Sequence, residues 1–158
     1  MELVAPDLHA RICAFYDEYG FVCDDEIERW PDLFTDDATY KIVSRENHER
    51  ELPLPTMSCD GRGMLRDRVT SMLRTSVYVP RQIRHLIANV RITGREDERV
   101  GTIANFAVFE SFEDTGSRIL AVGRYYDLIA TSGPELRFKE KVCVYDGNLV
   151  PGSIIYPL

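Results

Sequence analysis

Metal-binding side chains are few in this sequence and widely scattered. Its four cysteines form no CxxC motif and no pair with a histidine; they are Cys13, Cys23, Cys59 and Cys143. The three histidines are also far apart, at His9, His48 and His85. Such spacing does not fit a zinc site, an iron–sulfur cluster or a facial iron triad. We therefore expect no metal or other cofactor on this chain, and reduced thiols rather than disulfides.

An excess of positive charge and long apolar runs are missing as well. The 26 acidic and 19 basic side chains give a net charge of −7, which argues against nucleic-acid binding and against an anionic membrane surface. No apolar run has the length of a membrane span, and the first residues lack the basic start and apolar centre of a signal peptide. We expect a cytoplasmic protein whose 158 residues form a single domain, 1–158.

Apolar residues at helical spacing mark the first third of the chain. We expect Asp7 to cap a helix whose buried face carries Leu8, Ile12, Phe15, Tyr19 and Val22. A second, short helix is predicted to begin near Asp24 or Asp25, with Pro31 limiting its regularity and with Ile27, Trp30 and Phe34 facing inward. A strand is then expected at residues 38–44.

The following stretch, 45–63, has little periodicity and contains Pro53, Pro55, Gly61 and Gly63. We expect it to be irregular and either functional or bound at an interface. A third helix comes next, with one face formed by Leu65, Val69, Met72 and Leu73. The run Arg66-Asp67-Arg68 is typical either of a solvated helix face or of a docking surface for another subunit.

After Pro80 the pattern changes to strands, which are predicted at 84–94, 99–113, 117–131 and 136–146. Short polar turns separate them, so the four strands form an antiparallel meander. Three helices placed before a meander cannot supply parallel crossovers. The sequence therefore predicts an α+β fold, with three N-terminal helices packed on one face of a strongly curved, mainly antiparallel sheet.

One strand is apolar on both faces. In residues 99–113, one set of apolar side chains (Val100, Ala104, Phe106 and Val108) alternates with a second set (Ile103, Ala107 and Phe109). A single domain with three helices does not cover both faces, so we expect self-association as a trimer. Subunit contacts are predicted at Arg66, Arg68, Arg84, Phe106 and Tyr156.

His85 is the first candidate for chemistry, because it follows Arg84 on a long strand that faces the helices and has a side chain suited to a general base. The competing interpretation is a structural histidine in the core or at a subunit contact. Tyr40 and Asp127 are candidates to share its cavity, as are Tyr16, Tyr19 and Tyr125, although tyrosines are common in ordinary packing. Cys143 has no histidine near it in sequence and is expected to be inert.

The C-terminal tail is apolar and contains Ile154, Ile155, Tyr156 and Leu158. Exposed, it would be an aggregation hazard, so it must be packed. We expect it to lie across a groove, on its own sheet or at a subunit boundary, with Tyr156 as anchor; the boundary is the favoured place.

Six short motifs follow one another along the chain: Trp30-Pro31-Asp32-Leu33-Phe34, Tyr40, Arg45-Glu46-Asn47, Met64-Leu65-Arg66-Asp67-Arg68-Val69, Arg84-His85 and Gly123-Arg124-Tyr125-Tyr126-Asp127. Their order resembles the small (beta) subunit of Rieske-type aromatic-ring-hydroxylating oxygenases. The resemblance is strongest to small subunits that serve aromatic carboxylates, of the salicylate 5-hydroxylase, anthranilate dioxygenase and terephthalate dioxygenase types.

This resemblance implies the cone-shaped fold of nuclear transport factor 2 and a hetero-hexamer of three large and three small subunits. It implies that the Rieske [2Fe-2S] cluster and the mononuclear iron sit on the large (alpha) subunit and receive electrons from a ferredoxin and a reductase. This chain would then be non-catalytic by itself and mainly structural, in a complex for aromatic catabolism. The alternative is a stand-alone cone-fold dehydratase, isomerase or cyclase that uses His85, Tyr40 and Asp127.

Overall fold

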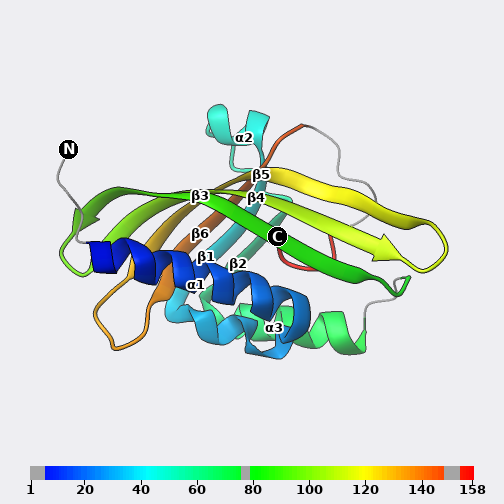
Figure 1. Cartoon of the computed structure of the whole chain (residues 1–158), viewed down its shortest axis with the longest axis horizontal. Helices are drawn as coiled ribbons and strands as arrows, with labels where there is room; N and C mark the ends of the chain where they lie inside the picture. Colours follow the sequence, from blue (N-terminus) through cyan, green and yellow to red (C-terminus); the bar gives the residue numbers. More distant parts are fainter. Residues whose placement is uncertain (1–5, 76–78, 148–153) are drawn as a thin grey trace.

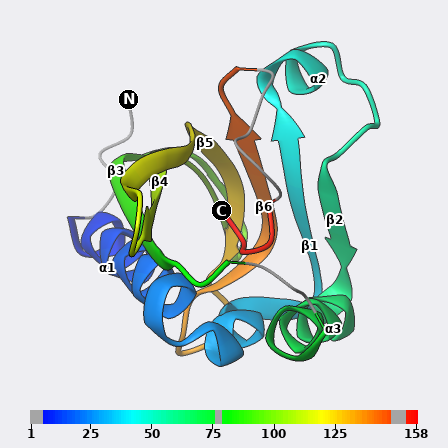
Figure 2. The ribbon, with the colours of Figure 1, turned by 90° about the vertical axis from the view of Figure 1, so that its right-hand side faces the viewer.

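The computed structural model describes residues 6–75, 79–147 and 154–158. Three helical segments lie on one side of a curved sheet: α1 (Pro6–Asp25), the 3₁₀ helix η1 (Ile27–Leu33) and α3 (Gly61–Arg74). The short helix α2 (Arg45–Glu49) lies on the opposite side (Figure 1). Figure 2 shows the sheet curling toward α1. We call the region between α1 and the concave face of the sheet, which buried side chains fill, the cone interior.

The sheet has six strands in the order β2-β1-β6-β5-β4-β3. They are β1 (Phe34–Ser44), β2 (Met57–Asp60), β3 (Gln82–Glu96), β4 (Arg99–Phe112), β5 (Gly116–Ala130) and β6 (Arg137–Tyr145). Only the β1–β6 pair is parallel among the described strands. The predicted α+β class and the mainly antiparallel, curved sheet are thereby confirmed.

The predicted strands of the meander end within two residues of those observed. Period-2 alternation explains this accuracy, since side chains along almost the whole of β4 are buried and partly buried in turn. The inward face of α1 is also as predicted, with Ile12, Tyr19 and Val22 fully buried. Asp7, however, lies in the first turn of the helix and does not cap it.

Other details of the first half also differ from the prediction. The strand expected at 38–44 begins earlier, at Phe34. The stretch 45–63 is not irregular throughout, because it holds α2 and the edge strand β2. Helix α2 begins where the Ser44 side chain accepts a hydrogen bond from the Asn47 amide, at 3.2 Å. On α3, Leu73 is 48 % exposed whereas Met72 is buried, so the apolar face is narrower than expected.

Aromatic rings and one glycine set the shape of the core. Trp30 packs edge-on against Phe34 and Tyr40, with ring centres 5.4 and 5.0 Å apart. At Gly123 a Cβ atom would lie 1.9 Å from the Val144 carbonyl oxygen, so β5 and β6 approach closely only because this residue has no side chain. Within the described ranges, no helix is long and apolar enough to cross a membrane.

Candidate functional site

The end of the C-terminal tail lies inside the cone interior of its own chain (Figure 2). Leu158 is completely buried and belongs to the hydrophobic core. Its main-chain oxygen accepts a hydrogen bond from the Tyr19 hydroxyl at 2.7 Å, and its amide donates to the Tyr40 hydroxyl at 2.9 Å. The anchor of the tail is therefore Leu158, not the half-buried Tyr156. Residues 148–153 of the predicted tail lie outside the described ranges.

His85 on β3 is buried beneath the tail. Its Nδ1 atom lies 2.6 Å from Asp24 Oδ1 on α1, and its Nε2 atom lies 3.1 Å from the Pro157 carbonyl oxygen. The backbone amide of His85 also donates to the Asp24 carboxylate. Both ring nitrogens thus have partners, and the tail covers the nitrogen that a substrate would need to reach.

Asp127 on β5 belongs to a second buried network. One of its oxygens accepts from the Lys141 ammonium at 2.9 Å and from the Tyr16 hydroxyl at 2.6 Å. The Tyr16 hydroxyl is also 2.8 Å from Thr102 Oγ1. Burial raises the pKa of Asp127, while Lys141 and Tyr16 act in the opposite direction. Asp127 is therefore committed to a buried ion pair within its own chain.

Lys141 on β6 is the charged residue that the sequence interpretation missed. It is fully buried, and its ammonium lies 3.4 Å from the ring centre of Tyr125 and 4.3 Å from that of Tyr19. These short distances indicate cation–π contacts that add to the ion pair. A usable signal was present, because Lys141 stands two positions before the inward-facing Cys143 on the same strand.

The three residues of the alternative enzyme hypothesis therefore share the cone interior but divide between two sets of contacts. His85 and Tyr40 bind the tail, whereas Asp127 binds Lys141 and Tyr16. Cys143 also faces the tail, with its sulfur 3.4 Å from the Leu158 oxygen. Burial raises the pKa of this thiol to about 12, so it remains protonated at neutral pH.

The predicted contact residues have diverse surroundings. Arg66 is exposed, and Arg68 donates to the carbonyl oxygens of Ile154 and Ile155, both at 3.2 Å, so it binds the tail of its own chain. Arg84 is exposed and lies 3.6 Å from Asp25. Phe106 is 2 % exposed and stacks on Tyr125.

The convex face of the sheet carries apolar side chains in register across three strands. Leu86, Ala107 and Val122 form one row, and Arg84, Phe109 and Ile119 form the next. We call these two rows the outer patch. Leu86, Val122 and Ile119 are 60 %, 40 % and 52 % exposed. The expectation that β4 is apolar on both faces is thus confirmed, since Val108 and its inward neighbours are buried on the other side.

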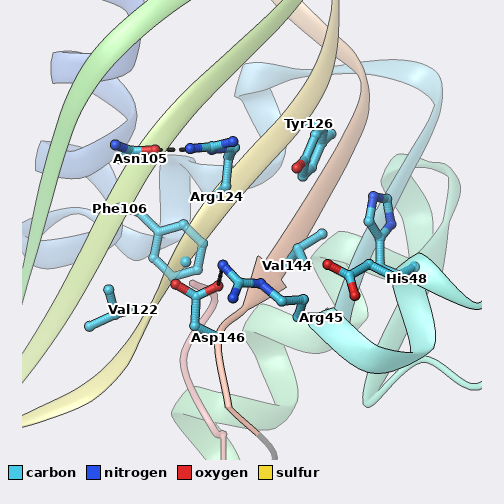
Figure 3. A pocket seen from close by; sticks show the side chains of 11 residues that line it. Arg45, His48, Asn105, Phe106, Val122, Arg124, Tyr126, Val144 and Asp146 are labelled. Carbon is cyan, nitrogen blue, oxygen red and sulfur yellow. Dashed lines mark hydrogen bonds and ion pairs between the residues drawn. The ribbon is translucent and has the colours of Figure 1, made fainter.

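A cavity of about 240 Å³ adjoins the outer patch beneath α2 (Figure 3). Arg45 closes one side through an ion pair with Asp146 at 2.8 Å. On the other side Arg124 donates to Asn105 at 3.1 Å, and the His48 ring lies 4.8 Å from that of Tyr126. The cavity has both charged and apolar lining residues, and its charged groups are suited to contacts with another polar surface.

Metal ligands do not gather anywhere in the part of the chain that the structure describes, where no group of three His, Cys, Asp or Glu side chains could hold an ion. His9 and Cys13 do lie one helical turn apart, with Nδ1 and Sγ at 3.7 Å, a pairing that the sequence interpretation overlooked. Two ligands of this kind do not make up an iron–sulfur or mononuclear iron site, so the residues present do not fit either group.

Comparison with known proteins gives a consistent result. The model of the family described as "Ring hydroxylating beta subunit" matches residues 21–151. The small subunit of anthranilate 1,2-dioxygenase from Burkholderia cepacia is 33 % identical over 139 residues, which cover 88 % of this chain and 86 % of that one. Subunit beta 1 of the terminal oxygenase component of terephthalate 1,2-dioxygenase from a Comamonas species is 26 % identical over 149 residues, covering 94 % and 97 %.

A solved structure agrees in both sequence and shape. A protein from Novosphingobium aromaticivorans, assigned as the beta subunit of an aromatic-ring-hydroxylating dioxygenase, is 35 % identical, with a TM-score of 0.87 over 98 % of each chain. The family match, the identities and the shared fold cover nearly the whole sequence. This chain therefore belongs to the ring-hydroxylating beta-subunit family.

Proposed function

We propose that this chain is an assembly subunit, which holds large (alpha) subunits together in a hetero-hexamer of three large and three small subunits. The observation that carries the proposal is the contrast between the two faces of the sheet. The concave face is filled by core side chains and by the tail, whereas the convex face leaves the apolar outer patch exposed. Exposed apolar side chains in register are typical of a surface that another subunit covers.

The contents of the cone interior support a structural role. His85, Tyr40 and Asp127 are the groups that a stand-alone dehydratase, isomerase or cyclase would use, and each is hydrogen-bonded within its own chain. Cation–π contacts of Lys141 with Tyr16 and Tyr19 hold α1 to the sheet, and the ion pair of Lys141 with Asp127 joins β6 to β5. A rigid cone of this kind presents a fixed outer surface, which suits a subunit that organises others.

The catalytic groups are assigned to the partner. We place the Rieske cluster and the mononuclear iron on the large subunit, supplied with electrons by a ferredoxin and a reductase, as the resemblance of the motifs implies. The relatives are named for anthranilate and terephthalate, both aromatic carboxylates. We infer that the complex of this chain hydroxylates an aromatic carboxylate in the cytoplasm, as a step in aromatic catabolism.

The experiment is co-expression of this chain with its large subunit, followed by affinity purification through the large subunit and measurement of the mass and stoichiometry. Equal numbers of the two chains in a hexamer are expected. Val122→Asp, at the β5 end of the outer patch, should reduce recovery of the small subunit by at least about tenfold, because a buried unpaired carboxylate costs several kcal/mol. The same chain purified alone should sediment as a trimer.

Leu73→Asp is the matched control, because Leu73 is similarly exposed but lies on α3, on the other side of the sheet (Figure 1). It should leave recovery unchanged. Equal recovery of the Val122→Asp and unmodified chains would contradict the role of the outer patch. Failure of the unmodified chain to bind any large subunit would contradict the assembly function itself.

A further inference from the structure

The last two residues of the chain are held as a bound small molecule would be held. Their main-chain oxygens face hydrogen-bond donors from four different elements. The Tyr19 hydroxyl lies 2.7 Å from the Leu158 oxygen, with the Tyr40 hydroxyl and the Cys143 thiol each at 3.4 Å. His85 Nε2 lies 3.1 Å from the Pro157 oxygen. Such convergence of donors on two neighbouring oxygens matches the chemistry of a carboxylate site.

His85 faces an acceptor on each side of its ring. Its Nδ1 atom faces the Asp24 carboxylate and its Nε2 atom faces a carbonyl. An anionic acceptor in place of the Pro157 carbonyl would form a stronger hydrogen bond with this ring, because a hydrogen bond with a charged partner is stronger than a neutral one.

The walls of the same site are aromatic. Tyr19 packs edge-on against Phe138 at 5.4 Å between ring centres, and Tyr40 packs edge-on against Trp30. The Leu158 side chain is enclosed by this apolar cluster. Tyr125, which stands opposite Cys143 in the sheet register, has a buried hydroxyl with no hydrogen-bond partner in the described ranges. The site therefore combines an apolar body with a donor-rich end.

We propose that the cone interior is a binding site for a small aromatic carboxylate, and that Pro157 and Leu158 occupy it as a built-in competitor. The ring of the ligand takes the place of the Leu158 side chain, and its carboxylate accepts the hydrogen bonds now made to the two main-chain oxygens. The site lies on the opposite face of the sheet from the outer patch, so the proposal goes beyond the assembly function.

Hydrogen bonds and the buried Leu158 side chain hold the tail in place, so a ligand has to compete with these contacts. Arg68 binds two of its carbonyl oxygens, and residues 154–156 are only partly buried. It forms no strand pairing in the described residues 154–158. A ligand that binds only the open form has its apparent affinity reduced by the fraction of molecules that are open. Variants that displace the tail should therefore bind the ligand more tightly.

The test uses benzoate as the probe, titrated by calorimetry into the full chain. Leu158→Asp puts a carboxylate where the aromatic cluster now encloses an apolar side chain, and so displaces the tail. We expect its dissociation constant for benzoate to be lower than that of the unmodified chain by at least about tenfold. Adding Tyr40→Phe to Leu158→Asp should weaken binding about fivefold to tenfold, because it removes one hydrogen-bond donor to a charged acceptor.

Two measurements locate the bound probe. In the unmodified chain, benzoate at saturation should speed hydrogen exchange in residues 154–158. Arg124→Gln, in the cavity of Figure 3, is the control for binding at the outer face and should leave the affinity unchanged. Circular dichroism checks that each variant is folded, and Leu158→Gly replaces Leu158→Asp if the latter is not.

The proposal is overturned if folded tail variants bind benzoate no more tightly than the unmodified chain. It is also overturned if Arg124→Gln, rather than Tyr40→Phe, weakens binding, because the probe would then sit at the outer face. Assembly with the large subunit is measured separately, so either result leaves the proposed function standing.

Discussion

At the scale of single residues, the buried ion pair of Asp127 and Lys141 is the feature with the largest energetic consequences. Both side chains are buried in an aromatic environment, where an unpaired charge is costly. Asp127→Asn should lower the free energy of unfolding by about 3–5 kcal/mol, because it leaves the ammonium without its counterion. Thermal or urea unfolding measures this change.

The double variant Asp127→Asn/Lys141→Met tests the cause of that loss. It removes both charges and keeps the volume similar, so most of the lost stability should return. If the double variant is as unstable as Asp127→Asn alone, the ion pair is not the reason for the effect.

The buried tyrosines predict instability in alkali. Burial raises the pKa values of Tyr16, Tyr19, Tyr40 and Tyr125 well above their usual value of about 10. Above pH 10 the unfolded chain loses these protons while the folded chain keeps them, so the unfolded state binds fewer protons and stability falls as pH rises. Each tyrosine contributes about 1.4 kcal/mol per pH unit. Unfolding measured across this pH range should show the decline, which should be absent below pH 9.

Tyr125→Phe keeps the aromatic ring and removes its hydroxyl, so it measures the contribution of the hydroxyl alone. The hydroxyl is buried without a partner in the described part of the chain, so its removal should stabilise the protein at neutral pH by about 1 kcal/mol. The slope of stability against pH in alkali should also fall by the contribution of one tyrosine, about 1.4 kcal/mol per pH unit. A loss of more than 1 kcal/mol at neutral pH would show that this hydroxyl has a partner, such as an ordered water molecule.

At the scale of elements, the close contact between β5 and β6 depends on Gly123. A methyl group there would meet the Val144 carbonyl oxygen and the Tyr145 Cα atom, which are backbone atoms that cannot turn aside. Gly123→Ala should therefore destabilise the fold by about 1–3 kcal/mol or more. Gly94→Ala on β3 is the matched control, because nothing lies within 4 Å of its added methyl group. Equal melting temperatures for the two variants would contradict this explanation of the close β5–β6 contact.

The elements also show what sequence reasoning could reach. The four strands of the meander were predicted nearly to their ends, because alternation over nine or more residues is a strong local signal. Helix α2 and strand β2 were missed, since five and four residues are too short for any period to show. The parallel pairing of β1 with β6 joins residues that are about a hundred positions apart, and no local pattern specifies it.

The candidate site was predictable only in part, for the same reason. Alternation placed His85 and Asp127 on inward faces, and their family motifs drew attention to them. Their partners come from elsewhere in the chain: Asp24 from α1 and Lys141 from β6. The tail was expected to be packed, but its position in the cone interior depends on Leu158, a residue with no distinguishing signal in the sequence.

At the scale of the whole molecule, the fold decides which apolar face of the sheet is buried in the core and which is exposed. The sequence pattern alone did not decide this. Val108 and Ala107 are neighbours on β4, yet one is buried in the core and the other lies in the outer patch. The family assignment makes the large subunit the expected partner of this chain, and the proposed hexamer uses the outer patch to reach another subunit. The Lys141 network then serves the complex only by keeping the cone rigid.

The most direct test of the assembly role is turnover by a complete complex that contains Asp127→Asn/Lys141→Met in place of the unmodified small subunit. Assembly and iron content are matched first, and hydroxylation of an aromatic carboxylate is then measured per large subunit. An assembly subunit predicts turnover within about threefold of the unmodified complex. A loss greater than about a hundredfold, near 3 kcal/mol of barrier, in a fully assembled and iron-replete complex would mean that the cone interior takes part in the chemistry, and would contradict the account.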